Sequence, residues 1–311
     1  MPMKGSVFVI GATGLVGDAL LRALRRRQIP VAAATYHCHP SEDYRQLDIQ
    51  DKAAVRAAIK ELKPAVVALP AANPFVDYCQ THPAETRRVN VDGSLNVLAA
   101  CAEIGARMVF FSSDYVFDGR RQSYGEDDPP SPLNEYGRQK AEVEAAVLSQ
   151  KSGHVIIRTS GAYGWQWEPK NFVLQVLSRL KAGQSMKVAC DIRYNPTSAE
   201  NLAEISVDLA QTGAEGLFHV VGAERIIRYD FAKRVAHFFG LDESLLLPVP
   251  NSEFLSHTPR PKESALKTGK VQAAVKTPLM GIETGLSHMK AQHDEWLAYA
   301  KTRLPKPTPS I

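Results

Sequence analysis

A tyrosine and a lysine stand four residues apart in the segment Tyr136-Gly137-Arg138-Gln139-Lys140. On a helix, side chains at this spacing share one face, with about 5–6 Å between their Cβ atoms. A free phenol titrates near pH ~10, and a neighbouring ammonium group favours the phenolate, so we expect the pKa of Tyr136 to be lowered. Such a pair can pass a proton to and from a carbonyl oxygen near neutral pH.

Two serines precede this pair and strengthen its interpretation. Ser112-Ser113 end the apolar run Met108–Ser112, which we expect to be a strand. A hydroxyl group there can orient the same carbonyl that the tyrosine protonates. The Tyr-x-x-x-Lys spacing is common by chance, so the serines are what make it informative.

A glycine-rich segment follows the first apolar strand and opens an amphipathic helix, Gly11-Ala12-Thr13-Gly14-Leu15-Val16-Gly17. This context is the one that a dinucleotide fingerprint requires. Gly11 permits the tight turn, Gly14 leaves room for a diphosphate, and Gly17 allows close packing of the helix on the strand. The N–H groups at the helix start then face the anion. The alternative is a glycine-rich turn without a ligand.

The end of the second strand reads Thr35-Tyr36-His37-Cys38-His39 and holds no carboxylate. An acidic side chain there normally binds the ribose 2′-OH of NAD, so NADP(H) is preferred and NAD(H) stays possible. Tyr36 and His37 are candidate cofactor contacts, although both histidines can equally be surface residues. Two histidines without further ligands do not predict a metal site. Asp48 and Ile49 are further cofactor candidates, Asp48 for the adenine amino group.

The elements that position these residues alternate between short apolar strands and helices, which indicates an α/β fold with a doubly wound, Rossmann-type parallel sheet. We predict a dinucleotide-binding domain over 1–160, to which later strands return, a smaller mixed substrate-binding region over 161–303, and a loose tail over 304–311. Predicted strands are Val7–Ile10, Val31–Ala34, Ala65–Leu69, Met108–Ser112, Val155–Arg158, Met186–Val188 and Leu217–Val221. Predicted helices cover Leu15–Leu24, Val55–Leu62, Asn90–Glu103, a segment from Glu135 with Asn134 as its cap, Phe172–Ala182, Ser198–Gln211, Asp230–Phe239 and Gly281–Thr302. Pro248–Lys276 reads as irregular.

The composition is that of an ordinary globular protein, with 311 residues, a net charge of +4 and 44% hydrophobic residues. Long disorder and fibrous structure are thereby excluded. The basic run Arg25-Arg26-Arg27 continues a helical pattern and is read as a solvated helix face, so no nucleic-acid partner is expected. Four separated cysteines predict neither a disulfide framework nor a zinc site, and favour the cytoplasm. No membrane span is expected.

Several motifs together resemble the extended short-chain dehydrogenase/reductases, and within them the dTDP-4-dehydrorhamnose reductase branch. The most specific is Ser112-Ser113-Asp114-Tyr115-Val116-Phe117-Asp118-Gly119. The likeness extends over roughly residues 5 to 290, and its other motifs are Gly11–Gly17, Val89-Asn90-Val91, Pro132–Lys140, Asp191–Thr197 and Arg260–Leu266.

The resemblance implies that Ser113, Tyr136 and Lys140 are catalytic. Tyr136 would be the general acid, Lys140 would hold the nicotinamide ribose and tune the phenol, and Ser113 would bind the substrate oxygen. It also implies that Asp114 and Tyr115 line the substrate site.

Two further positions follow from the resemblance. Ala71-Ala72 would pass under the cofactor. Asn90 would lie near the cofactor or cap a helix.

The chain also departs from the family pattern. Enzymes that form rhamnose carry a tryptophan facing the sugar where this chain has Gly161, so we expect an empty place in the substrate site. Trp165 and Trp167 either compensate from nearby or plug a loop. Leu69-Pro70 replaces the usual asparagine before the alanines.

The function implied is an NAD(P)H-dependent reductase, in deoxysugar biosynthesis, that acts on the 4-keto group of a nucleotide-linked 6-deoxy sugar. One alternative is a nucleotide-sugar epimerase or dehydratase of the same superfamily. Another is a non-catalytic NADP-binding regulatory subunit like that of methionine adenosyltransferase. A homodimer is the default assembly.

Overall fold

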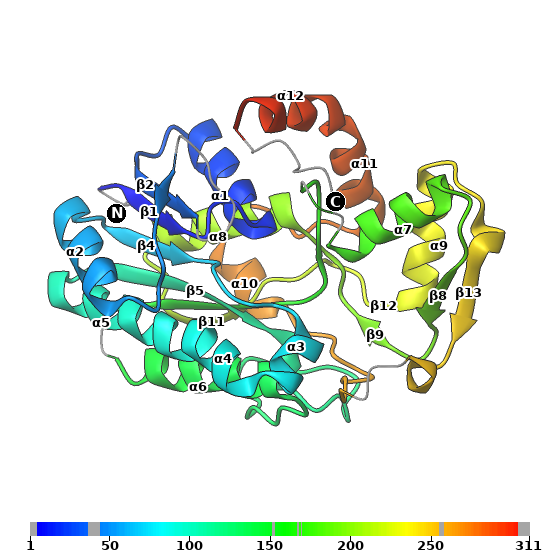
Figure 1. Ribbon diagram of the computed structural model, residues 1–311, viewed down its shortest axis with the longest axis horizontal. Helices are drawn as coiled ribbons and strands as arrows, with labels where there is room; N and C mark the ends of the chain where they lie inside the picture. The colour runs from blue at the N-terminus through cyan, green and yellow to red at the C-terminus, as the bar shows by residue number, and fades with distance from the viewer. Residues whose placement is uncertain are drawn as a thin grey trace.

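A seven-stranded parallel sheet forms the centre of the protein (Figure 1). The computed structural model describes residues 5–36, 44–150, 153–166, 168, 170–254 and 258–303, without the side chains of 299–303. The order of the strands is β11-β6-β5-β4-β1-β2-β3, and every neighbouring pair is parallel. Their bounds are β1 Val7–Ile10, β2 Val31–Tyr36, β3 Arg45–Gln46, β4 Val66–Leu69, β5 Arg107–Ser113, β6 Val155–Thr159 and β11 Gly216–His219. The predicted doubly wound parallel sheet is thus confirmed.

Helices cover both faces of the sheet. In β1, Val7 and Val9 point into one apolar core and Phe8 and Ile10 into the other, because successive side chains of a strand alternate between faces. Both faces are buried, which explains why these strands read as continuous apolar runs. The first core is covered by α1 Leu15–Arg26, α8 Ala199–Thr212 and α10 Gly269–Ala274, and the second by α2 Lys52–Leu62, α5 Ser94–Ile104 and α6 Glu135–Leu148.

Helix α6 begins where the sequence predicts. The Asn134 side chain accepts a hydrogen bond from the Gly137 N–H at 2.9 Å, so it is the N-cap of this helix. Its own Nδ2 group donates to the Pro259 carbonyl at 2.9 Å. The start of the helix that carries Tyr136 is therefore tied to a segment far along the chain.

The basic run at the end of α1 is more than a solvated face. Arg25 and Arg26 are exposed, as predicted. However, Arg26 binds carboxylates of α8, at 2.9 Å from Glu200 and 2.8 Å from Glu204, and Arg27 pairs with Glu204 too. These charges therefore join two helices that lie side by side on the sheet.

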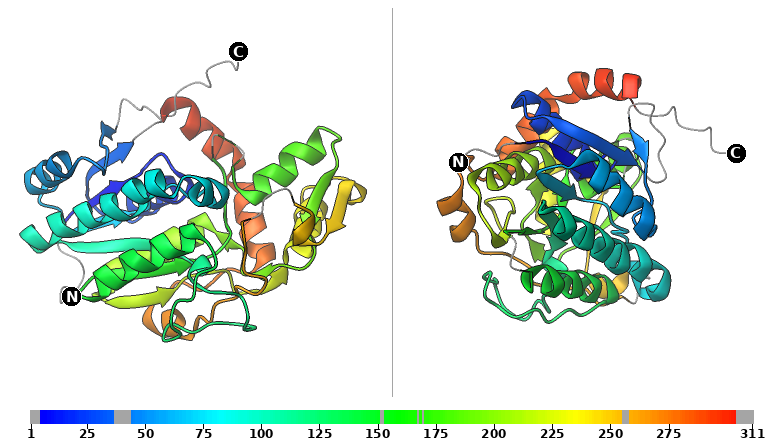
Figure 2. Two further views of the ribbon diagram at one scale, coloured as in Figure 1. Left: turned by 60° about the horizontal axis from the view of Figure 1, so that its bottom comes forward. Right: turned by 90° about the vertical axis from the view of Figure 1, so that its left-hand side faces the viewer.

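A smaller lobe lies beside the layered part, at the right of Figure 1 and of the left view of Figure 2. Its own apolar core gathers side chains from α7, α9 and α11 around residues such as Phe231. The remaining α-helices and strands after β6 are β7 Ala162–Tyr163, α7 Phe172–Lys181, β8 Met186–Ala189, β9 Arg193–Tyr194, β10 Thr197–Ser198, β12 Ile226–Ile227, α9 Arg228–Phe238, β13 Leu246–Val249, α11 Ile282–Ala291 and α12 His293–Arg303.

Three segments differ from the predictions. The segment predicted as one final helix is two, because the chain turns at Gln292 and thereby buries Trp296 against the rest of the protein. The region predicted as irregular contains the end of β13, a short 3-10 turn and α10. The third predicted helix begins with a π-helical turn over Arg88–Gly93 before α5.

Two short helices, α3 Val76–Thr81 and α4 Pro83–Arg87, are additional to the predictions. Across the described part of the chain, no helix combines the length and apolar character needed to cross a bilayer. The predicted tail over 304–311 lies outside the described residues.

Candidate active site

The glycine-rich turn lies where three neighbouring strands, β1, β4 and β5, end at one edge of the sheet. Gly11 has φ +96°, a conformation that side chains disfavour, and a Cβ atom there would lie 2.8 Å from the backbone of Ala71. Ala71 in turn donates its N–H to the Ile10 carbonyl at 3.1 Å. The structure therefore places the predicted turn against the predicted Ala71-Ala72 segment.

The start of α1 has the properties of an anion site. Gly14 is exposed, and the closest neighbour of a Cβ placed there is the Gly11 carbonyl oxygen at 3.5 Å. Within the described chain, no side chain caps this helix start. At Gly17, by contrast, a Cβ atom would overlap the Gly11 carbonyl oxygen. Backbone N–H groups at an open helix start fit the diphosphate of a dinucleotide.

The other predicted cofactor contacts differ in where they lie and in whether their side chains are exposed. Tyr36 ends β2, while His37 lies outside the described residues. The Asp48 carboxylate accepts a hydrogen bond from the Gln50 N–H at 2.9 Å. Ile49 is buried in the core, where its side chain packs on Gly93. The Ile49 side chain is therefore occupied by core packing. Thr13, Leu15 and Val16 are half-buried at the glycine-rich turn.

Ser113, Tyr136 and Lys140 come together at the end of β5. The Lys140 Nζ donates to the Phe111 carbonyl at 2.8 Å and lies 5.8 Å from the centre of the Tyr136 ring. The Ser113 hydroxyl is within hydrogen-bonding reach of the Tyr136 phenol, which lowers the pKa of that phenol in part. The arrangement can therefore hold a carbonyl oxygen between a phenol and a hydroxyl.

The pKa of Tyr136 changes in the direction opposite to the one predicted. Burial raises the pKa of this phenol, and the nearby Asp114 carboxylate raises it further. The Tyr-x-x-x-Lys spacing indicates only the effect of the lysine on the phenol. Desolvation depends on the tertiary structure, so the spacing gives no information about it. In the ligand-free protein Tyr136 therefore keeps its proton throughout the physiological pH range.

Burial also changes the charge of Lys140. Its side chain is 4% exposed, and desolvation lowers its pKa to about 8, although Glu144 one turn later opposes that change. An ammonium group with such a pKa loses its proton at mildly alkaline pH.

Asp114 is a buried carboxylate held by hydroxyl groups. It accepts hydrogen bonds from Ser113 at 3.0 Å and Ser160 at 2.7 Å, and Ser264 supplies another. Desolvation nevertheless raises the pKa of Asp114. The contacts of Ser160 and Ser264 with Asp114 were not predicted, because no spacing rule joins these residues along the chain. The signal that could have indicated Ser264 is its place in the motif Arg260–Leu266.

The Tyr115 ring packs next to the Tyr136 ring in an edge-to-face arrangement, with the ring centres 6.1 Å apart. Burial raises the pKa of Tyr115, and a hydrogen bond with Arg260 opposes this effect. Arg260 also donates to both carboxylate oxygens of Asp77 at 2.9 Å. The motif that begins at Arg260 thus reaches the site from the far end of the chain.

Asn90 is neither a helix cap nor a direct neighbour in the cluster of Ser113, Tyr136 and Lys140. Its Oδ1 accepts from the Asn73 N–H at 2.7 Å, and its Nδ2 donates to Gln139 at 2.8 Å and to the Asn73 carbonyl at 3.1 Å. It therefore joins the segment after Ala71-Ala72 to the helix that carries Tyr136. Its predicted nearness to the cofactor stays a prediction.

The place at Gly161 is not empty, which corrects the expectation from the family pattern. Gly161 has φ +50°, and a Cβ atom there would overlap Cε2 of the Tyr194 ring. Tyr194 is 4% exposed. An aromatic ring from another strand therefore fills the space into which a side chain at residue 161 would project.

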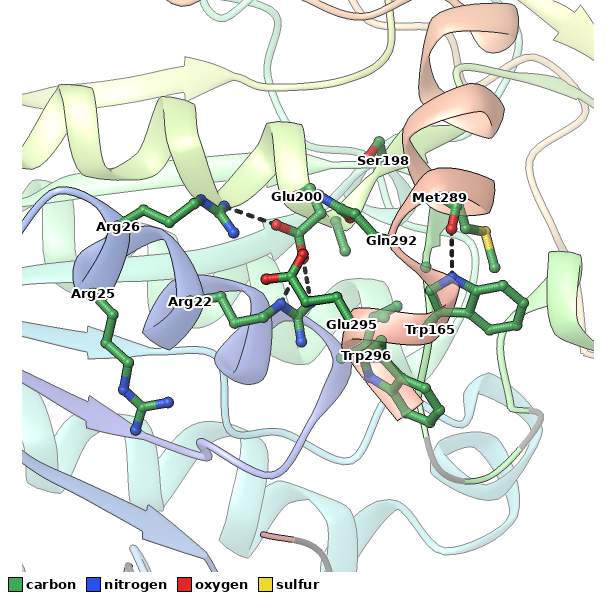
Figure 3. A pocket seen from close by; sticks show the side chains of 13 residues that line it. Arg22, Arg25, Arg26, Trp165, Ser198, Glu200, Met289, Gln292, Glu295 and Trp296 are labelled. Atoms are coloured by element: carbon green, nitrogen blue, oxygen red, sulfur yellow. Dashed lines mark hydrogen bonds and ion pairs between the residues drawn. The ribbon is translucent and has the colours of Figure 1, made fainter. Parts of the chain in front are cut away.

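Trp165 plugs a loop. Figure 3 shows its indole at the pocket between α1, α8 and the last two helices, where its N–H donates to the Met289 carbonyl at 2.6 Å. Its ring lies 4.5 Å from that of His293 and 6.1 Å from that of Trp296. The Trp165 side chain therefore packs between these helices. Trp167 lies outside the described residues.

Known proteins resemble this chain over most of its length. A family model described as "RmlD substrate binding domain" matches residues 3–294. The dTDP-4-keto-6-deoxy-D-glucose reductase of Streptomyces niveus is 31% identical over 281 residues, which cover 90% of this chain and 94% of that protein. The methionine adenosyltransferase 2 subunit beta of Xenopus laevis is 32% identical over 273 residues, which cover 85% and 80%. The crystal structure of dTDP-4-dehydrorhamnose reductase from Bacillus anthracis in complex with NADP matches with a TM-score of 0.84 at 27% identity, covering 93% of this chain and 100% of that chain.

Proposed function

The chain belongs to the RmlD substrate binding domain family of the extended short-chain dehydrogenase/reductases, and on this premise we propose that it reduces the 4-keto group of a nucleotide-linked 6-deoxy sugar with NAD(P)H. One observation carries the proposal. A protonated, half-buried phenol stands beside a serine hydroxyl and a lysine at the edge of the sheet where the glycine-rich turn also lies. This arrangement suits proton delivery to a carbonyl oxygen next to a dinucleotide.

Each residue of the site would have one role in the proposed reaction. Gly14 and the start of α1 would bind the diphosphate of the cofactor, and Ala71-Ala72 would pass beneath it. A bound reduced nicotinamide supplies hydride to the carbonyl carbon. Tyr136 would donate the proton to the oxygen, since its raised pKa keeps it protonated. Ser113 would hold that oxygen, and Lys140 would bind the nicotinamide ribose.

NADPH is the cofactor that we propose to be preferred. The described end of β2, Thr35-Tyr36, offers no carboxylate to bind a ribose 2′-OH. The relative from Bacillus anthracis was crystallised with NADP. NADH stays possible, and a comparison of initial rates at equal concentrations of the two cofactors decides between them. A cytoplasmic location and a homodimer belong to the same proposal.

Loss of absorbance at 340 nm, with dTDP-4-keto-6-deoxy sugar as substrate, tests the reaction. We expect wild-type protein to oxidise NADPH in proportion to product, which an epimerase or dehydratase does not do. Tyr136→Phe should lower kcat by roughly 10²–10⁴-fold while NADPH binding is kept. Tyr163→Phe, a buried tyrosine of the smaller lobe, is the matched control. Near-normal turnover by Tyr136→Phe would show that the assigned mechanism is wrong.

A second candidate is a non-catalytic NADP-binding subunit. The observation that favours it is the 32% identity to the methionine adenosyltransferase 2 subunit beta of Xenopus laevis. A purified protein that binds NADPH, forms a stoichiometric complex with a methionine adenosyltransferase catalytic subunit and reduces no keto sugar would support this candidate. Turnover with a keto sugar would support the reductase.

A further inference from the structure

Gln139 is a buried side chain of α6 that the proposed reaction does not use. It directly precedes Lys140 in the sequence and is 1% exposed. A buried amide needs hydrogen-bond partners for both its oxygen and its nitrogen. Here the Oε1 atom accepts a hydrogen bond from the Asn90 Nδ2 group at 2.8 Å. The Nε2 group donates to the Thr86 hydroxyl at 3.0 Å and to the Pro83 carbonyl at 3.3 Å. Both ends of the Gln139 amide are therefore engaged.

Asn90 extends this connection to the segment after β4. Its amide binds both backbone groups of Asn73, since Oδ1 accepts from the N–H at 2.7 Å and Nδ2 donates to the carbonyl at 3.1 Å. An Asn90 amide turned end for end would lose both bonds. The Gln139 oxygen can only accept, so it keeps the Asn90 nitrogen on its own side. Gln139 thereby selects the orientation of Asn90 that binds Asn73.

The backbone around Asn90 supplies a separate observation. Asn90 is fully buried and lies in the π-helical turn Arg88–Gly93. Its carbonyl accepts a hydrogen bond from the Ser94 hydroxyl at 2.7 Å. Such turns are rare, and they frequently occur at functional sites. The distortion of this helix therefore coincides with the residue that joins Gln139 to Asn73.

The two ends of the connection carry groups that the proposed reaction needs at a fixed separation. At one end, Asn73 lies two residues after Ala71, whose backbone packs against the glycine-rich turn. At the other end, Gln139 lies between Tyr136 and Lys140 on α6. A shift of either end would change the position of the cofactor segment relative to the catalytic pair.

From these contacts we propose that Gln139 is a positioning residue, which fixes the Ala71–Asn73 segment relative to Tyr136 and Lys140; the inference rests on the proposed function. Its side-chain bonds go to α4 and to the π-helical turn, so it acts through Asn90 and through the backbone of α6. Transfer of hydride and proton requires close alignment of the reacting groups, and a misplacement of about 1 Å can cost about 100-fold in rate. The loss of Gln139 therefore affects the cofactor and the reaction rate as well as stability.

The variant Gln139→Met tests the proposal in fluorescence titrations with NADPH and in initial rates with the keto sugar. Methionine is similar in length but has no amide to orient Asn90. We expect the Kd for NADPH to rise roughly three- to tenfold, the effect of losing a neutral hydrogen bond. We expect kcat to fall roughly ten- to hundredfold. The KM for the keto sugar should change by less than about twofold, because the groups that bind the sugar are kept.

The matched control is Asn201→Leu in α8. Asn201 is 2% exposed, and its amide also binds a backbone segment at both ends. It donates to the Pro278 carbonyl at 2.9 Å and accepts from the Met280 N–H at 2.9 Å. Its loss should lower Tm while the Kd for NADPH and kcat stay at their wild-type values. If Gln139→Met lowers Tm in the same way and leaves both values unchanged, Gln139 is only structural and the proposal is overturned.

The variant Gln139→Glu adds a pH readout. Its protonated carboxyl group can accept from Asn90 and donate to Thr86, as the glutamine does. Its ionised form has no donor and stands beside Glu135, whose carboxylate lies 3.3 Å from the Gln139 nitrogen. Burial and this carboxylate raise the pKa of the introduced group above the usual value of about 4.3. The ratio of its kcat to that of wild type should therefore rise as pH falls from about 8 to about 5, whereas the ratio for Gln139→Met should stay constant. Parallel ratios for the two variants would count against the positioning role.

The measurements separate this inference from the proposed function. If wild-type protein reduces the keto sugar and Gln139→Met retains its kcat and its Kd for NADPH, the positioning role is overturned and the reductase stands. If wild-type protein binds NADPH but reduces no keto sugar, the reductase is overturned. Weaker NADPH binding by Gln139→Met, beside normal binding by Asn201→Leu, would then still support the link from Gln139 to the cofactor segment.

Discussion

The buried Lys140 should make the stability of this protein rise with pH over a range that the structure defines. The lysine is 4% exposed, and its pKa falls from 10.5 in the unfolded chain to about 8 in the folded protein. Between these values the unfolded chain binds a proton that the folded protein has released. Stability therefore increases as pH rises through this interval, and below it the contribution is constant and unfavourable.

The size of the effect follows from the two pKa values. Their separation corresponds to about 3 kcal/mol of unfolding free energy at about 1.4 kcal/mol per pH unit. Over the accessible interval from pH ~7.5 to pH ~9.5 the expected gain is about 2 kcal/mol. Staying at or below this upper limit keeps exposed tyrosines, with a pKa of about 10, mostly protonated.

Urea unfolding of wild type and Lys140→Met at a series of pH values measures this gain. The methionine keeps the aliphatic stem but cannot titrate, so the difference between the two proteins isolates the lysine. We expect that difference to be flat between pH ~6 and pH ~7 and to move by about 2 kcal/mol in favour of wild type by pH ~9.5. Parallel curves for the two proteins would refute the reasoning, because they would mean that burial does not change the proton affinity of Lys140.

Two further predictions concern packing and charge. Glu144 and Arg158 form a buried pair with both side chains 2% exposed and contacts of 2.9 and 2.6 Å, so Glu144→Gln should lower the unfolding free energy by about 3–5 kcal/mol in urea titrations. Glu142→Gln, on the exposed face of the same helix, should change it by less than about 1 kcal/mol, and equal losses would contradict the argument. Gly17→Ala should weaken NADPH binding at least about tenfold in fluorescence titrations, since its methyl group displaces the turn at the helix start. Gly269→Ala, where a Cβ meets open space, should bind NADPH like wild type.

Local signals in the sequence were sufficient for six strands of the central sheet, but not for the short edge strand β3 Arg45–Gln46. Val7–Ile10 is a strand with the predicted bounds, and β5 and β6 extend the predicted ones by only a residue or two. The Asn134 cap and the Gly11 turn with its positive φ were also predictable, because caps and tight turns depend on a few adjacent residues. The break at Gln292 was not, since the helical periodicity continues through it and tertiary packing of Trp296 decides the turn.

The sequence by itself determined which groups can do the chemistry: a serine, a tyrosine and a lysine after one strand, and a glycine-rich turn after another. Tertiary structure alone decided their state. Burial and Asp114 raise the pKa of Tyr136, and the Tyr194 ring fills the space beside Gly161. Motif spacing reports contacts within a few residues along the chain, whereas desolvation and close packing depend on every element that covers a side chain. For that reason the candidate catalytic groups could be identified from the sequence, whereas their proton affinities and the packing around Gly161 could not.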